Sequence, residues 1–98
     1  MSGKMKAKKE FVRFADFLKT IGHPNRLKII CLLLGHKKIC VSEVALRSGL
    51  SVADASHHLR VMARRGILRP QRRGKEICYA IGSGEFVSDI KRLICKYK

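Results

Sequence analysis

Acidic residues are scarce in this 98-residue chain, which has 7 Asp and Glu against 22 Lys and Arg and a formal net charge of +15. So many positive side chains repel one another in a compact protein unless a polyanion neutralises them. Each DNA phosphate that a protein neutralises releases condensed counterions, which favours binding. The composition therefore favours a nucleic acid as the partner. A merely soluble basic surface is the alternative that composition alone leaves open.

Long apolar runs are also missing. No run approaches the roughly 18 residues that cross a membrane, and the basic segment MSGKMKAKKE is not followed by the apolar core of a secretory signal. We therefore expect a cytoplasmic protein that contacts no membrane. The four cysteines are then expected to be reduced thiols and not a disulfide framework.

Signatures of catalysis are absent as well. The sequence has no Gly-rich phosphate loop, no paired carboxylates, no CxxC motif and no cysteine with a persuasive histidine base. We expect a protein that is not an enzyme and that uses no cofactor.

Hydrophobic periodicity divides the chain into a basic tail at residues 1–9, expected to be flexible, and one compact domain at residues 10–98. Apolar residues at helical spacing predict five helices, and an alternating pattern predicts a hairpin. The helices are predicted at 10–22, 24–34, 42–48, 51–65 and 85–97, and the hairpin joins strands 67–71 and 76–81 through a turn at 72–75. The expected fold is mainly α with a small β-hairpin, arranged as a winged helix-turn-helix.

Local signals mark the ends of these helices. Pro24 suits a first helical turn, Gly35 closes the same helix, and Ser42 is expected to cap the third. Ser51 and Asp54 have the spacing of a capping box at the start of the fourth helix. The side chains expected to face inward on that helix are Val52, Ala55, Leu59 and Met62.

The fourth helix and the hairpin form the predicted DNA reader, because the second helix of a helix-turn-helix enters the major groove. The DNA-contact candidates on this helix are Ser51, Val52, Ala53, Ser56, His57, Arg60 and Arg64. Arg72, Arg73 and Lys75 at the hairpin tip are expected to contact the backbone or the minor groove. A solvated turn is the alternative for this basic run, but the run directly follows the exposed helix face, which favours DNA.

Residues 17–81 resemble the ArsR/SmtB winged-helix regulators of bacteria and archaea. The resemblance is carried by LKTIGHPNRLKIICLLL, by VSEVALRSGLSVADASHHLRVMARRGIL and by a basic wing ending in CYAI. It implies a homodimer formed by the first and last helices, bound to an inverted-repeat operator in double-stranded DNA. It also implies repression that an inducer relieves. Relatives often carry Gln at position 52 and Pro or Ser at position 53, where this chain has Val52 and Ala53.

Family members differ in the inducer that they sense. Residues 85–98 contain no histidine, so the zinc or nickel site of the last helix is absent, and no metal site is assigned. The arsenic-sensing members have a Cys-Val-Cys triplet where this chain has Cys40, Val41 and Ser42, and a hydroxyl is a poor ligand for a soft ion. Cys40 could pack in the core or join other cysteines, and Cys78 is expected to pack in the wing.

Cys31 and Cys95 lie where the persulfide-sensing branch, the BigR, SqrR and HlyU type, carries its two reactive cysteines. The resemblance implies that a reactive sulfur species or an oxidant links them and weakens DNA binding. Two alternatives remain: a repressor responsive to a thiol-bound metal or metalloid such as arsenite through Cys40, or a constitutive nucleic-acid-binding protein with no thiol switch.

Overall fold

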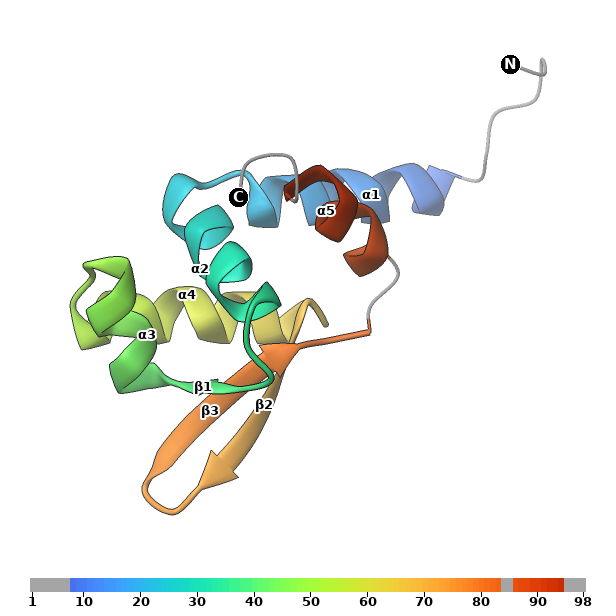
Figure 1. Cartoon of the computed structure of the whole chain (residues 1–98). Helices are drawn as coiled ribbons and strands as arrows, with labels where there is room; N and C mark the ends of the chain where they lie inside the picture. The colour runs from blue at the N-terminus through green and yellow to red at the C-terminus, as the bar shows by residue number, and fades with distance from the viewer. Residues whose placement is uncertain (1–7, 84–85, 95–98) are drawn as a thin grey trace.

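The computed structural model describes residues 8–83 and 86–94 and contains five helices and three strands within them. Figure 1 shows α1 and α5 at one end of the molecule and the β2–β3 hairpin projecting from the other. The elements are α1 (Lys8–Ile21), α2 (Pro24–Leu34), β1 (Ile39–Cys40), α3 (Val41–Ser48), α4 (Val52–Arg64), β2 (Leu68–Arg73), β3 (Glu76–Ile81) and α5 (Val87–Ile94). The predicted winged helix-turn-helix is confirmed.

The first two helices form largely as the sequence predicts. The first begins at Lys8, two residues before the expected start, and the rest of the predicted tail lies outside the described residues. The second has its predicted bounds, with Pro24 in the first turn and Gly35 as the C-cap. His23 caps this helix, because its Nδ1 accepts a hydrogen bond from the Asn25 N–H over 3.2 Å.

The third helix starts one residue earlier than predicted, and its N-cap is Cys40 and not Ser42. The prediction was wrong because Cys40 is already extended at the end of β1, so the change to helical backbone falls directly after it. Ser42 instead donates a hydrogen bond to Glu76 in the third strand. The helix ends at Gly49, whose φ of 71° is a conformation that glycine adopts without steric cost.

The predicted hairpin is part of a three-stranded antiparallel sheet with the order β1-β3-β2. The first strand escaped prediction because two residues are too few for a periodic signal. The turn is also tighter than predicted: the second strand runs through Arg73, which pairs with Glu76, so Arg72 and Arg73 are strand residues.

The core lies where α2, α3 and α4 meet the sheet, and its fully buried side chains include Ile29, Ile30, Leu33, Val44, Leu59 and Met62. The predicted inward face of α4 is confirmed for Ala55, Leu59 and Met62 but is wrong for Val52, which is 56% exposed. Val52 opens the helix at a spacing of four residues from Ser56 and eight from Arg60, and it shares their face.

The last helix packs its buried Val87 and Ile90 against the rest of the domain. The ring of Phe86 lies 5.1 Å from that of Phe14 and 5.0 Å from that of Phe17, which joins the start of α5 to α1. The remainder of the predicted helix, including Cys95 and Tyr97, lies outside the described residues. Within residues 8–83 and 86–94, no helix has the length and hydropathy of a membrane span.

Candidate nucleic-acid interface and thiol sites

The exposed start of α4 forms the first part of the candidate interface. Ser51 caps the helix, because its Oγ accepts a hydrogen bond from the Asp54 N–H over 3.0 Å. This contact is the serine half of the predicted capping box, and it involves the backbone N–H of Asp54 and not its carboxylate. Six predicted contact residues are exposed and the seventh, Ser56, is half-buried: the exposed ones are Ser51, Val52, Ala53, His57, Arg60 and Arg64.

A groove of about 290 Å³ separates this helix face from the third strand of the wing and the turn before it. Val52, Ser56 and Arg60 line one side, and Lys75 and residues of β3 line the other. The guanidinium of Arg60 donates a hydrogen bond to Ser56 Oγ, which holds the long side chain along the helix. Helix and wing therefore present one continuous concave surface, on which a duplex could contact both.

Tyr79 forms the floor of this groove. It is 2% exposed, and its burial raises the pKa of the phenol above the usual 10.0, although the positive charge of Arg60 acts in the opposite direction. The phenol therefore stays protonated at neutral pH and adds no negative charge beneath a surface that would meet phosphates.

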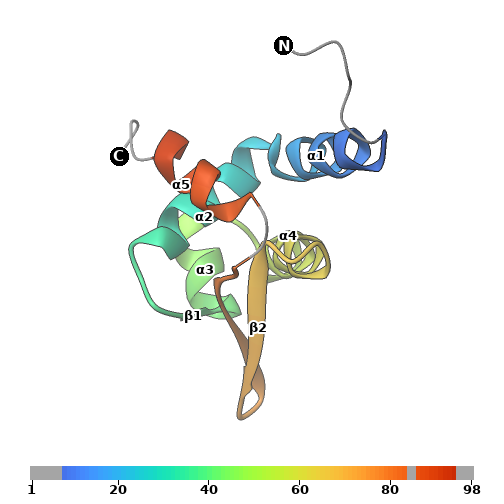
Figure 2. The ribbon, with the colours of Figure 1, turned by 90° about the vertical axis from the view of Figure 1, so that its right-hand side faces the viewer.

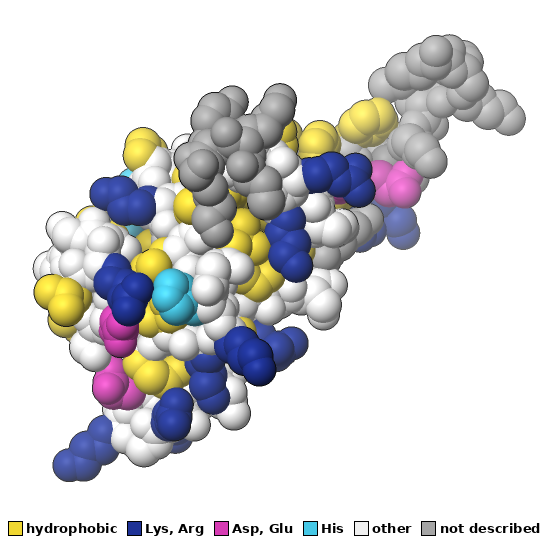
Figure 3. All heavy atoms as spheres, viewed as in Figure 1, with side chains coloured by type: hydrophobic (Ala, Val, Ile, Leu, Met, Phe, Trp, Pro, Cys, Tyr) yellow, Lys and Arg dark blue, Asp and Glu magenta, His cyan; other side chains and the backbone are white. Residues whose placement is uncertain are grey.

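The wing carries the second part of the interface. Arg72 and Arg73 are exposed on β2, and Lys75 is exposed in the turn. Figure 2 shows this hairpin standing clear of the helical body, and Figure 3 shows Lys and Arg side chains spread over it. A protruding basic hairpin suits contact with the DNA backbone beyond the groove that the helix enters.

The buried side of α4 is held by a contact that the sequence analysis did not find. Arg26 Nε donates to His58 Nδ1 over 3.0 Å, and Arg26 Nη1 donates to the Thr20 carbonyl oxygen over 3.0 Å. Burial, followed by the charges of His23 and Arg26, lowers the pKa of His58 below its usual 6.5. A neutral imidazole whose Nδ1 accepts from an arginine is the consistent state. His58 is 8% exposed and packs on the buried side of the recognition helix.

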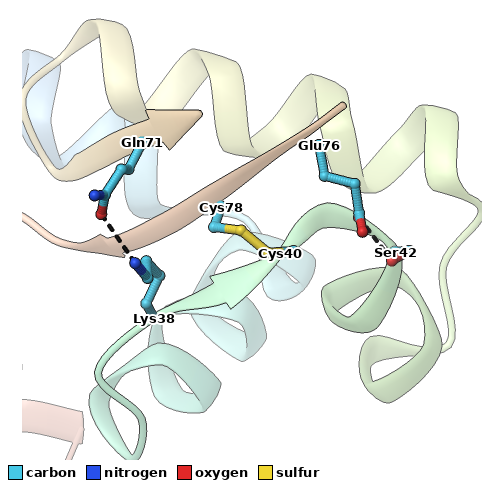
Figure 4. The surroundings of a disulfide bond; sticks show 6 residues. All are labelled: Lys38, Cys40, Ser42, Gln71, Glu76 and Cys78. Carbon is cyan, nitrogen blue, oxygen red and sulfur yellow. Dashed lines mark hydrogen bonds between the residues drawn. A yellow bond between two sulfur atoms is a disulfide. The ribbon is translucent and has the colours of Figure 1, made fainter. Parts of the chain in front are cut away.

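Two hydrogen bonds and one disulfide join the wing to the segment around α3, as Figure 4 shows. Lys38 Nζ donates to Gln71 Oε1 over 3.1 Å, and Ser42 Oγ donates to Glu76 Oε1 over 2.8 Å. Between them Cys40 and Cys78 form a disulfide. The expectation of four reduced thiols is therefore wrong for this pair, because strand pairing places cysteines 38 residues apart opposite one another.

Residues 23–69 match the model of the bacterial regulatory proteins of the arsR family. The HTH-type transcriptional regulator YgaV of Escherichia coli strain K12 is 32% identical over 84 residues, covering 83% of this chain and 85% of that protein. The chain belongs to the arsR family. It is thus related to DNA-binding transcriptional regulators, in agreement with the resemblance of residues 17–81.

Two solved structures relate this arsR-family chain to the BigR, SqrR and HlyU branch, which the positions of Cys31 and Cys95 indicate. HlyU from Vibrio cholerae N16961 superposes with a TM-score of 0.82 at 28% identity, covering 92% of this chain and 97% of that one. The transcriptional repressor BigR from Xylella fastidiosa superposes with a TM-score of 0.79 at 27% identity, covering 92% and 88%. The described residues of this arsR-family member thus share the fold of HlyU and BigR.

One of the two predicted sensor thiols can be located. Cys31 is a free, half-buried cysteine on α2 that lines an apolar groove of about 520 Å³ between α1, α2 and α5. Ile90, Leu93 and Ile94 of α5 line the same groove. Cys95 follows Ile94 directly in the sequence and lies outside the described residues. No group of three or more His, Cys, Asp or Glu able to hold a metal is found in the part of the chain that the structure describes.

Proposed function

We propose that this chain is a homodimeric, sequence-specific transcriptional repressor whose affinity for its operator falls when a reactive sulfur species links Cys31 to Cys95. The observation that carries the proposal is the concave surface shared by the exposed face of α4 and the basic wing. It acts as a binding protein without a cofactor and without catalysis, in the cytoplasm, where bacterial DNA is found.

Base readout is assigned to the helix and affinity to the wing. Arg60 is suited to a bidentate contact with guanine, and the small Ala53 to contact with a thymine methyl group. Arg72, Arg73 and Lys75 neutralise phosphates, which adds affinity that does not depend on sequence.

An exposed apolar surface supports the homodimer. Phe11, Phe14 and Leu18 of α1 are 45%, 45% and 47% exposed, and Leu93 of α5 is 56% exposed. Burying such side chains is favourable by about 25 cal/mol per Å² of apolar surface. A second copy offers the same face, and a two-fold dimer places two recognition helices on two half-sites of an inverted repeat.

The groove beside Cys31 supports the location of the switch, because its walls come from α2 and from the helix that leads to Cys95. The chemistry needs one persulfide, RSSH, for each linked pair. One cysteine thiolate attacks the outer sulfur, RSH leaves, and the cysteine becomes a persulfide. The second cysteine attacks the inner sulfur of that protein persulfide, which forms the disulfide and releases hydrogen sulfide. Such a cross-link fixes α5 against α2, and α5 is part of the proposed dimer surface.

The test is a gel-shift titration of wild type, Cys31→Ser and Cys95→Ser, each with and without a persulfide donor. The probe is the DNA directly upstream of the gene, with a scrambled duplex as the control. We expect the donor to weaken binding of wild type by at least about tenfold, equivalent to 1.4 kcal/mol, and to leave both variants unchanged. If both variants still lose affinity on treatment, the switch assignment is wrong. Binding that is indifferent to the donor and to DNA sequence would indicate a constitutive nucleic-acid-binding protein instead.

A further inference from the structure

The disulfide between Cys40 and Cys78 occupies a short junction in the sheet. The first strand contributes two residues, and the bonded cysteines form the second of its two pairs with β3, after Ile39 and Tyr79. A ladder of two pairs has little backbone pairing of its own to stabilise it. The disulfide adds a covalent link at a junction that otherwise depends on two residue pairs and on the buried side chain of Ile39.

The two cysteines belong to different parts of the DNA-binding surface. Cys40 is the N-cap of α3, the first helix of the helix-turn-helix, while Cys78 lies within the third strand, in the wing. Their bond links the helix-turn-helix to the wing directly. The flanking Ser42–Glu76 and Lys38–Gln71 hydrogen bonds are exposed, so water competes with both of them.

The pair is also asymmetric in exposure. Cys78 is 0% exposed, whereas Cys40 is half-buried and can be reached from solvent. Cys40 is also the N-cap residue of α3, and its side chain makes no capping hydrogen bond that would compete with sulfur chemistry. An accessible cysteine next to a buried one is an arrangement suited to an attacking cysteine and a resolving cysteine.

We propose that Cys40 and Cys78 form a second, independent thiol switch, oxidised by peroxides, that clamps the wing to the helix-turn-helix. This inference rests on the proposed function in one respect: a transcription regulator in a reducing compartment keeps a disulfide only transiently, as a sensor. Cys40 thiolate attacks the peroxide, the O–O bond breaks, and the products are a sulfenic acid and water or an alcohol. The Cys78 thiol then displaces the hydroxyl as water. The protein loses two electrons and two protons, equivalent to two hydrogen atoms, and the peroxide gains them.

Oxidation at this pair and oxidation at Cys31 and Cys95 have opposite effects. The Cys40–Cys78 disulfide holds the wing in one orientation before DNA binds, so the wing loses less conformational freedom on binding. We expect the oxidised pair to bind DNA about three- to tenfold more tightly than the reduced pair. The cross-link proposed for Cys31 and Cys95 weakens binding.

The experiment uses the full chain in a Cys31→Ala, Cys95→Ala background, in which only one pair of thiols remains. The matched control is the same background with Cys40→Ser, and Cys78→Ala serves if that variant is unstable. Each protein is reduced with dithiothreitol without denaturant, treated with hydrogen peroxide, and analysed by thiol alkylation, intact mass, and hydrogen exchange of residues 68–81. Affinity for the upstream DNA is measured in both states.

We expect the background protein to lose both thiols and a mass of two hydrogens on treatment, to recover both on reduction, and to exchange wing amides more slowly when oxidised. The Cys40→Ser control should show no change in wing exchange. A bond that resists the reductant, or wing exchange that is equal in both states, would overturn the inference. If the protein binds DNA in neither state, the proposed function fails, while the exchange comparison still decides whether the clamp exists.

Discussion

Replacing Arg26 with alanine tests how the recognition helix is held in place. The guanidinium joins three elements, because it donates over 3.0 Å to His58 Nδ1 on α4 and over 3.0 Å to the Thr20 carbonyl on α1, from its own position on α2. His58 and Thr20 are 8% and 5% exposed, so water cannot fully replace the lost donor. Arg26→Ala therefore leaves two shielded acceptors without this partner.

The expected cost follows from those two contacts. A buried polar group that loses its partner costs about 1–3 kcal/mol, and hydrogen bonds to charged groups lie at the upper end of the scale. Allowing for partial hydration of the site, we expect Arg26→Ala to lower the free energy of unfolding by about 2–3 kcal/mol. The matched control is Arg65→Ala, which removes only the ion pair to Asp16, whose side chains are 51% and 41% exposed. Such surface pairs contribute about 0–1 kcal/mol.

The assay is urea unfolding followed by circular dichroism, with all proteins at one concentration because dimerisation makes stability depend on it. Arg26→Ala should lower the midpoint much more than Arg65→Ala, and Arg26→Lys should recover part of the loss through one restored contact. If the losses for the two alanine variants agree within about 0.5 kcal/mol, the Arg26–His58 contact does not hold the helix, and the reasoning is refuted.

Three further predictions concern DNA reading and the pH dependence of stability. Arg60→Ala should cost about 1–3 kcal/mol at one base pair and relax the preference there. Arg73→Ala should weaken binding to every sequence and reduce the dependence on salt by about one phosphate contact. Both are measured by fluorescence anisotropy on operator and scrambled DNA. Because the pKa of His58 is lowered in the folded state, the unfolded state takes up its proton first as pH falls. Stability should therefore decline as pH falls below about 6.5, and His58→Gln should reduce that decline in urea titrations.

These predictions have clear contradicting outcomes. Equal and sequence-independent losses from Arg60→Ala and Arg73→Ala would mean that α4 does not read bases. An unchanged decline below pH about 6.5 in His58→Gln would assign the acid sensitivity to another group. His36→Gln is the matched control there, because His36 is an exposed histidine on the loop after α2.

Local chemistry explains which parts of the fold were predictable. Helix α2 has its predicted bounds because Pro24 and Gly35 act on the backbone beside them. Ser51 caps α4 for the same reason, as its partner is three residues away. The boundary at Cys40 was missed because it depends on pairing with β3, a strand that lies far along the sequence.

In the candidate site, too, local patterns predicted some residues correctly and misplaced others. Charge and helical spacing were enough to assign Arg60, Arg72 and Arg73 to an exposed basic surface, and all three are exposed. Helical spacing also predicted that Val52 is buried, which is wrong. Periodicity gives only the angular position of a residue on the helix, and it does not show that the first turn of α4 lies beside the groove between helix and wing.

The sequence by itself therefore determined the order of the helices, the basic character of the DNA-facing surface and the family, because these depend on neighbours within a few residues or on composition. Only the tertiary structure decided that Cys40 meets Cys78, that Arg26 supports His58, and that Cys31 opens onto a groove shared with α5. Each of these contacts joins segments about 30 or more residues apart, and the packing of the elements creates a proximity that no local pattern encodes.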